Sequence, residues 1–249
     1  MQEKIGAILF RWRNLLFPII FILLFTISPA SIWHDATIDA HFFWAGLAVA
    51  LCGVVVRLLV ASTYYVKRAG RDGSVHADTL YVGGPFALTR NPLYVGNVLI
   101  ASGFLILLGN PVVIMSGVLI TILAYQSIIA TEERYLKTRF GEQYDNYQKI
   151  VPRWIPTLSR WKIAYLNIGF CWRRALAMEY STAGAVVAGS IIMAIRLDIT
   201  SGIQVPSVLW VLLAVTIATI AYVRNFKKAG RLQTQLIRFF YEFAKWSPA

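Results

Sequence analysis

The chain has 249 residues, of which 57% are hydrophobic, 14% are aromatic and only 14% are charged. Soluble domains carry about a quarter of charged residues, so the composition excludes a disordered protein, a secreted disulfide scaffold and an ordinary soluble enzyme, and leaves a polytopic membrane protein. The net charge of +12 comes from 24 Lys and Arg against 12 Asp and Glu, and its meaning depends on where the basic residues lie.

Several apolar runs approach or exceed the roughly 20 residues that a membrane helix needs. They cover residues 15–33, 41–61, 94–131, 181–197 and 206–223. The third run is nearly of double length and is interrupted at Gly109-Asn110-Pro111, where Gly favours a helix end and Pro a helix start. The sequence therefore predicts an all-α, polytopic integral membrane protein with about six transmembrane helices, two of them joined in a tight hairpin.

The first run admits a second interpretation. Lys4, Arg11 and Arg13 precede it, as basic residues precede the apolar part of a cleavable signal peptide. Pro29 fits poorly beside a cleavage site, and further spans follow. We therefore expect the first helix to be retained.

The distribution of basic residues predicts the orientation. With the N-terminus inside and an even number of spans, Arg196 is the one basic residue that falls outside. This bias is what the positive-inside rule requires, so we expect a multi-pass protein with cytoplasmic N- and C-termini and membrane lipids, not nucleic acid, as its surroundings. The net charge then reflects topology.

We expect three regions along the chain. Residues 1–40 form an N-terminal transmembrane helix, 41–159 a core, and 160–249 an appended helical pair with a basic amphipathic tail on the lipid surface. The two cysteines, Cys52 and Cys171, are far apart in sequence and the histidines are scattered, so no metal site is expected.

Arg57 lies within the second run, about one helical turn from its inward end. An ionisable group at such a position is a functional candidate. The alternative is that its long stem lets the guanidinium reach the interface.

The segment from Gly83 to Tyr94 ends where the hairpin begins. Asn91 is expected to cap the following helix, and Pro92 suits its first position. The free NH groups at this helix start, helped by Arg90, could bind a ligand's carboxylate. The alternative is a loop that simply starts a helix.

Glu132 and Glu133 lie at the inward end of the hairpin's second helix. Neighbouring helical residues point about 100° apart, so the two carboxylates cannot share a face. Glu133 and Lys137 have the spacing of an ion pair. Glu132 has no basic residue at that spacing, and a carboxylate at the membrane edge is a natural acceptor for a ligand's ammonium group, but the sequence leaves open which of the two glutamates contacts a ligand.

The next segment, residues 139–156, contains Gly141, which is expected to end one short helix, and two prolines that stop the next. Tyr144 and Tyr147 share a helix face, and their periodicity favours an interfacial aromatic belt over a binding site.

These segments together resemble one family. Gly84-Pro85-Phe86, Arg90-Asn91-Pro92-Leu93-Tyr94, Glu132-Glu133, Phe140 to Tyr144, Tyr147 and Val151-Pro152-Arg153 have the order and spacing of the isoprenylcysteine carboxyl methyltransferases and their phospholipid methyltransferase relatives. The resemblance covers roughly residues 45–156. It implies an integral-membrane enzyme that holds S-adenosylmethionine at its cytosolic face, surrounded by Gly84, Pro85, Arg90, Asn91, Pro92, Tyr94, Glu132 and Glu133. Many family members have His where this chain has Asn91 and Tyr where it has Phe86.

The resemblance also implies that Arg57 holds the substrate carboxylate, which makes it the catalytic candidate. A carboxylate is already ionised at pH 7 and needs an Arg to place it, whereas an amine first needs a base. Further candidates for contact with the substrate are His76, Tyr144 and Arg153. For His76, a solvated loop position is the alternative.

We therefore expect a membrane methyltransferase whose lipophilic acceptor, an isoprenylcysteine-type carboxylate, enters from the bilayer. Alternative acceptors are a phospholipid amine, a thiol or a lipophilic small molecule. Alternatives of another class are a membrane reductase that uses NADPH, and a small transporter or assembly factor.

Overall fold

The computed structural model describes residues 2–28, 33, 35–63, 77, 79–165 and 169–228. Over this part of the chain all regular structure is helical, which confirms the all-α fold class. In chain order the elements are α1 (Gln2–Ile27), α2 (Ala36–Thr63), η1 (Gly84–Ala87), α3 (Pro92–Leu107), α4 (Pro111–Phe140), α5 (Glu142–Ile150), η2 (Leu158–Arg160), α6 (Trp161–Tyr165), α7 (Trp172–Thr200) and α8 (Ser207–Lys228).

Four helices, α2, α4, α7 and α8, are long and apolar enough to cross a membrane, which makes this an integral membrane protein. Two further apolar stretches, Phe17–Ile27 of α1 and Pro92–Leu107, are shorter. At 1.5 Å per residue, the 16 residues of α3 extend only about 24 Å. The count of about six spans is thus supported for four helices, while α3 falls short of the usual length.

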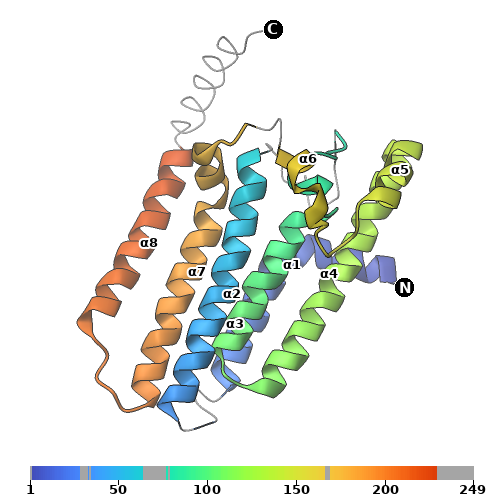
Figure 1. Ribbon diagram of the computed structural model, residues 1–249. Coiled ribbons are helices and arrows are strands. Elements are labelled where there is room, and N and C mark those ends of the chain that lie inside the picture. The colour runs from blue at the N-terminus through green and yellow to red at the C-terminus, as the bar shows by residue number, and fades with distance from the viewer. Residues whose placement is uncertain are drawn as a thin grey trace.

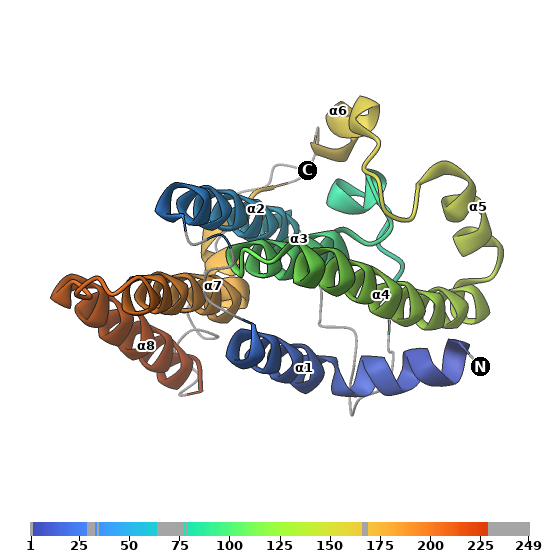
Figure 2. The same ribbon diagram turned by 90° about the horizontal axis from the view of Figure 1, so that it is seen from below.

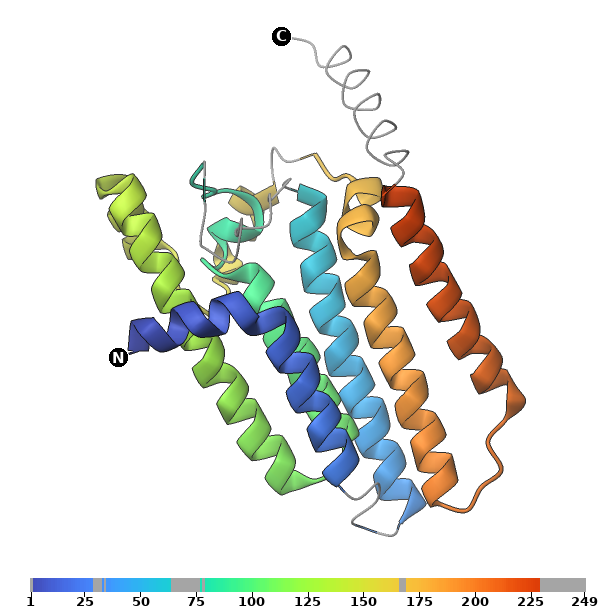
Figure 3. The same cartoon turned by 180° about the vertical axis from the view of Figure 1, so that it is seen from behind.

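The helices form a row in the order α8, α7, α2, α3 and α4, and α1 packs against α4 from behind (Figures 1 and 3). Successive helices of the row run in alternate directions, so α2 ends and α3 and α7 begin at the same end of the molecule (Figure 1). Figure 2, seen from below, shows α5 and α6 displaced from the row. The end of the molecule where α2 and α4 end and α3 begins carries the short helices of the described residues.

Close contact between α2 and α3 depends on glycine. A Cβ added to Gly103 would lie 2.5 Å from the backbone nitrogen of Ala50 and 2.6 Å from the carbonyl oxygen of Gly46. Gly53 and Gly96 form a second such pair about two turns further along α2. A Cβ on Gly53 would lie 2.6 Å from the carbonyl oxygen of Gly96. Small residues let membrane helices approach until their backbones touch, so these glycines fix the spacing of α2 and α3.

The predicted hairpin is confirmed. Gly109 adopts a φ of 67°, which ends α3 without steric cost. The side-chain oxygen of Asn110 accepts hydrogen bonds from the backbone nitrogens of Val112 and Val113, at 3.0 and 3.2 Å. Pro111 occupies the first turn of α4. Each of the three residues therefore has the role that its type favours.

The second helix of the hairpin is longer than expected. α4 continues through Glu132 and Glu133 to Phe140, so the separate short helix expected before Gly141 is instead the end of α4. Gly141, with a φ of 53°, separates α4 from α5. The continuous helix carries both glutamates to the end of the row where the short helices lie.

The helix α7 is tied closely to the core. Arg174 is buried and donates from Nε to the carbonyl oxygen of Ala61 at 3.0 Å, and the backbone nitrogen of Cys171 donates to the carbonyl oxygen of Ser62 at 3.0 Å. These bonds satisfy carbonyls that the end of α2 leaves open. The division at residues 159 and 160 stays a prediction, but α7 packs along α2 as a neighbour in the same row.

Candidate functional site

A cavity of about 1430 Å³ lies among α1, α2, α3, α4, α5 and α7. Small-molecule sites commonly measure about 300 to 1000 Å³, so this volume has room for more than one ligand. One part of its wall is polar and contains Arg57, Arg90, Tyr94, Asn97, Glu132 and Glu179, and the rest is largely apolar, with Ile20, Phe21, Leu24, Phe104, Leu105 and Ile120. We refer to the part of the cavity beside the polar residues as the polar chamber and to the part beside the apolar residues as the apolar limb.

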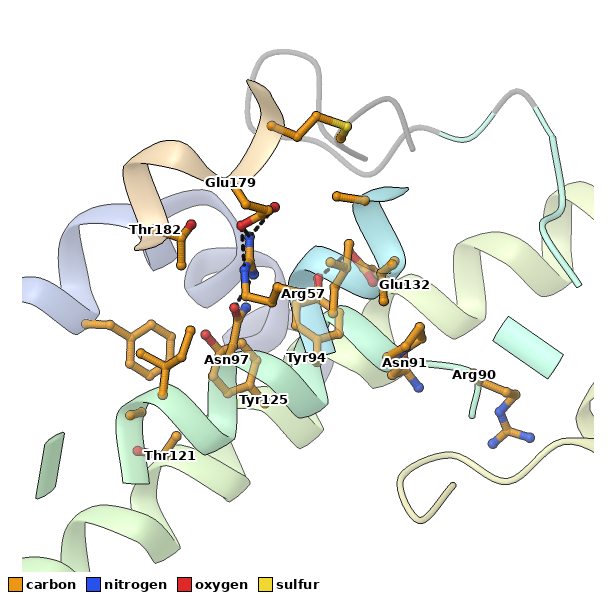
Figure 4. A pocket seen from close by; sticks show the side chains of 18 of the residues that line it. Arg57, Arg90, Asn91, Tyr94, Asn97, Thr121, Tyr125, Glu132, Glu179 and Thr182 are labelled. Carbon is orange, nitrogen blue, oxygen red and sulfur yellow. Dashed lines mark hydrogen bonds and ion pairs between the residues drawn. The ribbon is translucent and has the colours of Figure 1, made fainter. Parts of the chain in front are cut away.

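Arg57 lies in the polar chamber and is bound on two sides (Figure 4). Its Nε donates to Oε2 of Glu179 at 2.8 Å and its Nη2 to Oε1 of Glu179 at 2.9 Å, while Nη1 donates to the side-chain oxygen of Asn97. The side chain of Arg57 is 13% exposed and that of Glu179 is 4% exposed. Arg57 is thus fixed inside the protein and does not extend to the interface as a snorkelling side chain would.

Sequence reasoning missed both partners of Arg57. Asn97 is a polar residue one turn inside an apolar run, which was a usable signal. Glu179 lies two residues before the apolar run at 181–197, and no role was predicted for it. Only the packing of α7 against α2 brings Glu179 to Arg57, across 122 residues of sequence.

Glu132 and Tyr94 form the second polar group of the chamber (Figure 4). The Tyr94 hydroxyl donates to Oε1 of Glu132 at 2.5 Å. The Tyr94 ring lies 5.3 Å from the ring of Tyr125, and the Tyr125 ring stacks on Phe17 of α1 at 4.9 Å. A carboxylate therefore borders an aromatic wall, which suits a ligand that carries both a cation and a ring.

Glu133 has a different environment. Its carboxylate is 7% exposed and accepts from Nε of Arg90 at 3.1 Å and from Arg153. Arg90 also donates from Nη1 to the carbonyl oxygens of Gln148 and Val151. Glu133 thus joins the start of α3 to the segment after α5. The expected pair of Glu133 with Lys137 is wrong, because Lys137 pairs with Asp145 at 2.9 Å.

The start of α3 also differs from the expectation. The side chain of Asn91 does not cap the helix; it donates to the carbonyl oxygen of Arg153 at 3.2 Å. The backbone carbonyl of Asn91 accepts from the nitrogens of Tyr94 and Val95, both at 3.0 Å. Because these NH groups are bound within the chain and Pro92 has none, fewer donors remain for a ligand at this helix start than we expected.

The segment before α3 supports the chamber from outside. Gly84 has a φ of 55° and starts η1, in which Gly84 and Pro85 are buried. Phe86 lines the cavity, and its carbonyl oxygen accepts from the Tyr147 hydroxyl at 2.7 Å. Gly84, Pro85 and Arg153 lie outside the described lining of the cavity, whereas Arg90, Asn91, Pro92 and Tyr94 belong to it.

Tyr144 and Tyr147 are buried beside the cavity, so the expected interfacial belt is wrong. They pack with Leu80, Leu136 and Val151. Burial raises the pKa of both phenols far above the usual range, and the charge of Glu133 adds to the increase for Tyr144. Both tyrosines therefore remain neutral hydroxyls. His76 lies outside the described residues.

Among the described residues, no group of three or more His, Cys, Asp or Glu side chains could hold a metal ion.

Comparison with known proteins supports the family resemblance. Residues 42–143 match the phospholipid methyltransferase family. A protein-S-isoprenylcysteine O-methyltransferase of Tribolium castaneum is 31% identical over 153 residues, which are 56% of this chain and 54% of the relative. One of Schizosaccharomyces pombe is 39% identical over 79 residues, or 32% of this chain and 34% of the relative. The chain thus spans about half or less of these two relatives.

A protein of a different description also matches. A cobalt-zinc-cadmium resistance protein of Cupriavidus metallidurans is 28% identical over 161 residues, which are 65% of this chain and 67% of the relative. No solved structure matches the chain.

Proposed function

Because residues 42–143 of this chain belong to the phospholipid methyltransferase family, we propose that the protein is an integral-membrane methyltransferase that uses S-adenosylmethionine. Its acceptor is a lipophilic carboxylate of the isoprenylcysteine type. The observation that carries this proposal is the two-part cavity, in which a charged chamber opens into an apolar limb between the helices.

The chamber's residues fit the cofactor. Glu132 offers a carboxylate for its amino group, and Tyr94 and Tyr125 offer aromatic faces for its sulfonium or its adenine ring. Arg90 lines the same chamber and supplies positive charge near the start of α3. When bound, S-adenosylmethionine supplies a methyl group that is electrophilic because the sulfonium carries it.

Gly84, Pro85, Asn91, Pro92 and Glu133 act in this proposal as the support of the chamber. Glu133 fixes Arg90, and the bond from Asn91 to the carbonyl of Arg153 fixes the loop beneath it. Arg153 in turn neutralises Glu133. These residues position the groups that contact the cofactor.

The acceptor's carboxylate binds Arg57, and its tail occupies the apolar limb. A carboxylate needs no base, so the work of the protein is alignment and the exclusion of water. The largely apolar wall around Phe21 and Phe104 excludes water from the tail. The end of the molecule that holds α5 and α6 faces the cytosol, where the water-soluble cofactor enters, and both termini lie on that side.

A phospholipid amine is the second candidate acceptor. Three carboxylates, Glu132, Glu133 and Glu179, line the cavity. Glu133 already pairs with Arg90 and Arg153, so an ammonium group would pair with Glu132 or Glu179. This candidate predicts label in the lipid fraction when native membranes are incubated with the enzyme and labelled cofactor. A carboxylate acceptor instead gives a base-labile methyl ester.

Calorimetry of the detergent-purified protein with S-adenosylhomocysteine tests the class of enzyme. We expect binding by the wild type, and an affinity at least about tenfold lower in Glu132→Gln because the charge opposite the ligand's ammonium is lost. Glu142→Gln is the matched control, since Glu142 is exposed on α5. Folded protein that binds a nicotinamide dinucleotide and not S-adenosylhomocysteine would contradict the proposal.

A further inference from the structure

Helix α7 lies outside the segment that matches the family, yet it supplies the group that holds Arg57. Glu179 is buried and binds Arg57 through both carboxylate oxygens. A side-on contact of this kind, through Nε and Nη2, fixes the plane of the guanidinium. The family resemblance does not account for this residue.

The remaining donors of Arg57 decide what Glu179 can do. A guanidinium has five N–H donors; Nε and Nη2 bind Glu179, and Nη1 binds Asn97. The edge formed by Nη1 and Nη2 therefore keeps donors beyond those that Glu179 uses. Arg57, Asn97 and Glu179 all line the same cavity, so this edge borders the space in which an acceptor would lie.

We propose that Glu179 is a positioning residue for methyl transfer. It binds the edge of the Arg57 guanidinium formed by Nε and Nη2, so that the edge formed by Nη1 and Nη2 faces the acceptor's carboxylate. This inference rests on the proposed function, because it assumes a carboxylate acceptor at Arg57. Asn97 is the neutral partner that the incoming carboxylate replaces or joins on Nη1.

The charge balance agrees with this role. Together, Arg57 and Glu179 are neutral, so the pair is tolerated inside the membrane before the acceptor arrives. The methyl ester that the reaction forms carries no charge and is held by Arg57 less strongly than the ionised acceptor. Fixed orientation, more than net attraction, is therefore what Glu179 contributes.

Glu179→Asp is the most informative variant. It keeps the negative charge, so Arg57 stays compensated and the fold is preserved, but its carboxylate is withdrawn by one carbon–carbon bond of about 1.5 Å. Misalignment of about 1 Å costs up to about 100-fold in rate. With an N-acylated S-prenylcysteine as acceptor, we expect kcat to fall at least about tenfold, with KM and the affinity for S-adenosylhomocysteine within about twofold of the wild type.

Two further variants complete the test. Glu179→Gln removes the charge and is expected to lose at least as much kcat. Asp198→Asn, a carboxylate-to-amide change at the opposite end of α7, is expected to keep wild-type kinetics. Arg57→Ala should raise KM for the acceptor as well as lower kcat, because it removes the binding group itself.

Three outcomes would overturn the inference. Wild-type kcat in Glu179→Asp would mean that the charge alone matters. A lower KM for the acceptor with unchanged kcat, in Glu179→Asp or Glu179→Gln, would mean that Glu179 competes with the acceptor for Arg57. A wild-type enzyme that binds S-adenosylhomocysteine but does not methylate the prenylcysteine would contradict the proposed acceptor, and the role of Glu179 would fall with it. The first two outcomes leave the proposed function standing.

Discussion

Adjacent residues in α4 reach opposite environments. Both glutamates line the cavity, but Glu132 binds the hydroxyl of Tyr94, whereas Glu133 is buried between Arg90 and Arg153. The rotation of about 100° between neighbouring helical residues produces this separation. Glu132 thus borders the aromatic wall of the cavity, while Glu133 holds the start of α3 against the segment after α5.

This difference predicts separate effects of two similar substitutions. Glu133→Gln leaves two guanidinium groups without an ionised partner, and breaking a buried pair in this way costs about 3 kcal/mol or more of stability. We expect a clearly lower Tm in detergent. Glu132→Gln keeps an acceptor for Tyr94 and should change Tm much less. Equal Tm values for the two variants would contradict the structural role of Glu133.

At the scale of residues, the sequence predicted side chains that share one cavity, but not the pairs that they form. Arg57, Tyr94 and Glu132 were predicted, and they share one cavity. Their partners depend on contacts across long stretches of chain, as between Arg57 and Glu179, or on the choice between two neighbours, as between Lys137 and Asp145. Local spacing contains no information on either.

At the scale of elements, the glycines between α2 and α3 control the geometry of the site. Gly96 leaves room for the stem of Arg57, because a Cβ there would lie 2.6 Å from Cγ of Arg57. Gly103, two turns further along α3, faces the backbone of α2. A side chain at either position would separate the helix that carries Arg57 from the helix that carries Asn97.

Gly103→Ala is therefore expected to destabilise the protein by about 3 kcal/mol, at the upper end for overpacked cores, because backbone atoms cannot move aside easily. Gly117→Ala is the matched control. Its Cβ would meet only the side-chain end of Leu105, and alanine favours a helix more than glycine does. Thermal unfolding in detergent should show a lower Tm for Gly103→Ala than for Gly117→Ala. The reverse order would show that α2 and α3 can separate without cost.

Element boundaries were predicted well where capping residues mark them. The turn at Gly109-Asn110-Pro111 is an example, because each residue there satisfies the backbone locally. The bend of α1, which contains Pro18 and changes direction along its length in Figure 3, was not predicted. The apolar run around the proline served only as evidence for a span, although proline removes a helix hydrogen bond and commonly bends a helix.

At the scale of the whole molecule, the alternating helices separate two ends of different character. The helix α5 lies at the end where α3 begins and α4 ends, and the loop between α7 and α8 lies at the other (Figure 1). With the first end in the cytosol, Glu142 and Ile203 face opposite sides of the membrane; both are exposed.

Cysteine labelling tests this orientation. In a background with Cys52→Ala and Cys171→Ala, a membrane-impermeant maleimide applied to intact cells should label Ile203→Cys. It should label Glu142→Cys only after the membrane is permeabilised. Labelling in the opposite pattern would show that the cavity's polar chamber faces away from the cytosol.

The bond between Arg57 and Glu179 has a consequence for biosynthesis. The two residues are 122 positions apart, and ribosomes add about 5 to 20 residues per second. Arg57 is therefore made roughly 6 to 24 s before its counter-ion exists. During that interval a guanidinium sits near the edge of a newly inserted α2 with no α7 beside it. Arg57 thus gains its counter-ion only after α7 has been made, and a chain that stops before α7 leaves this charge uncompensated.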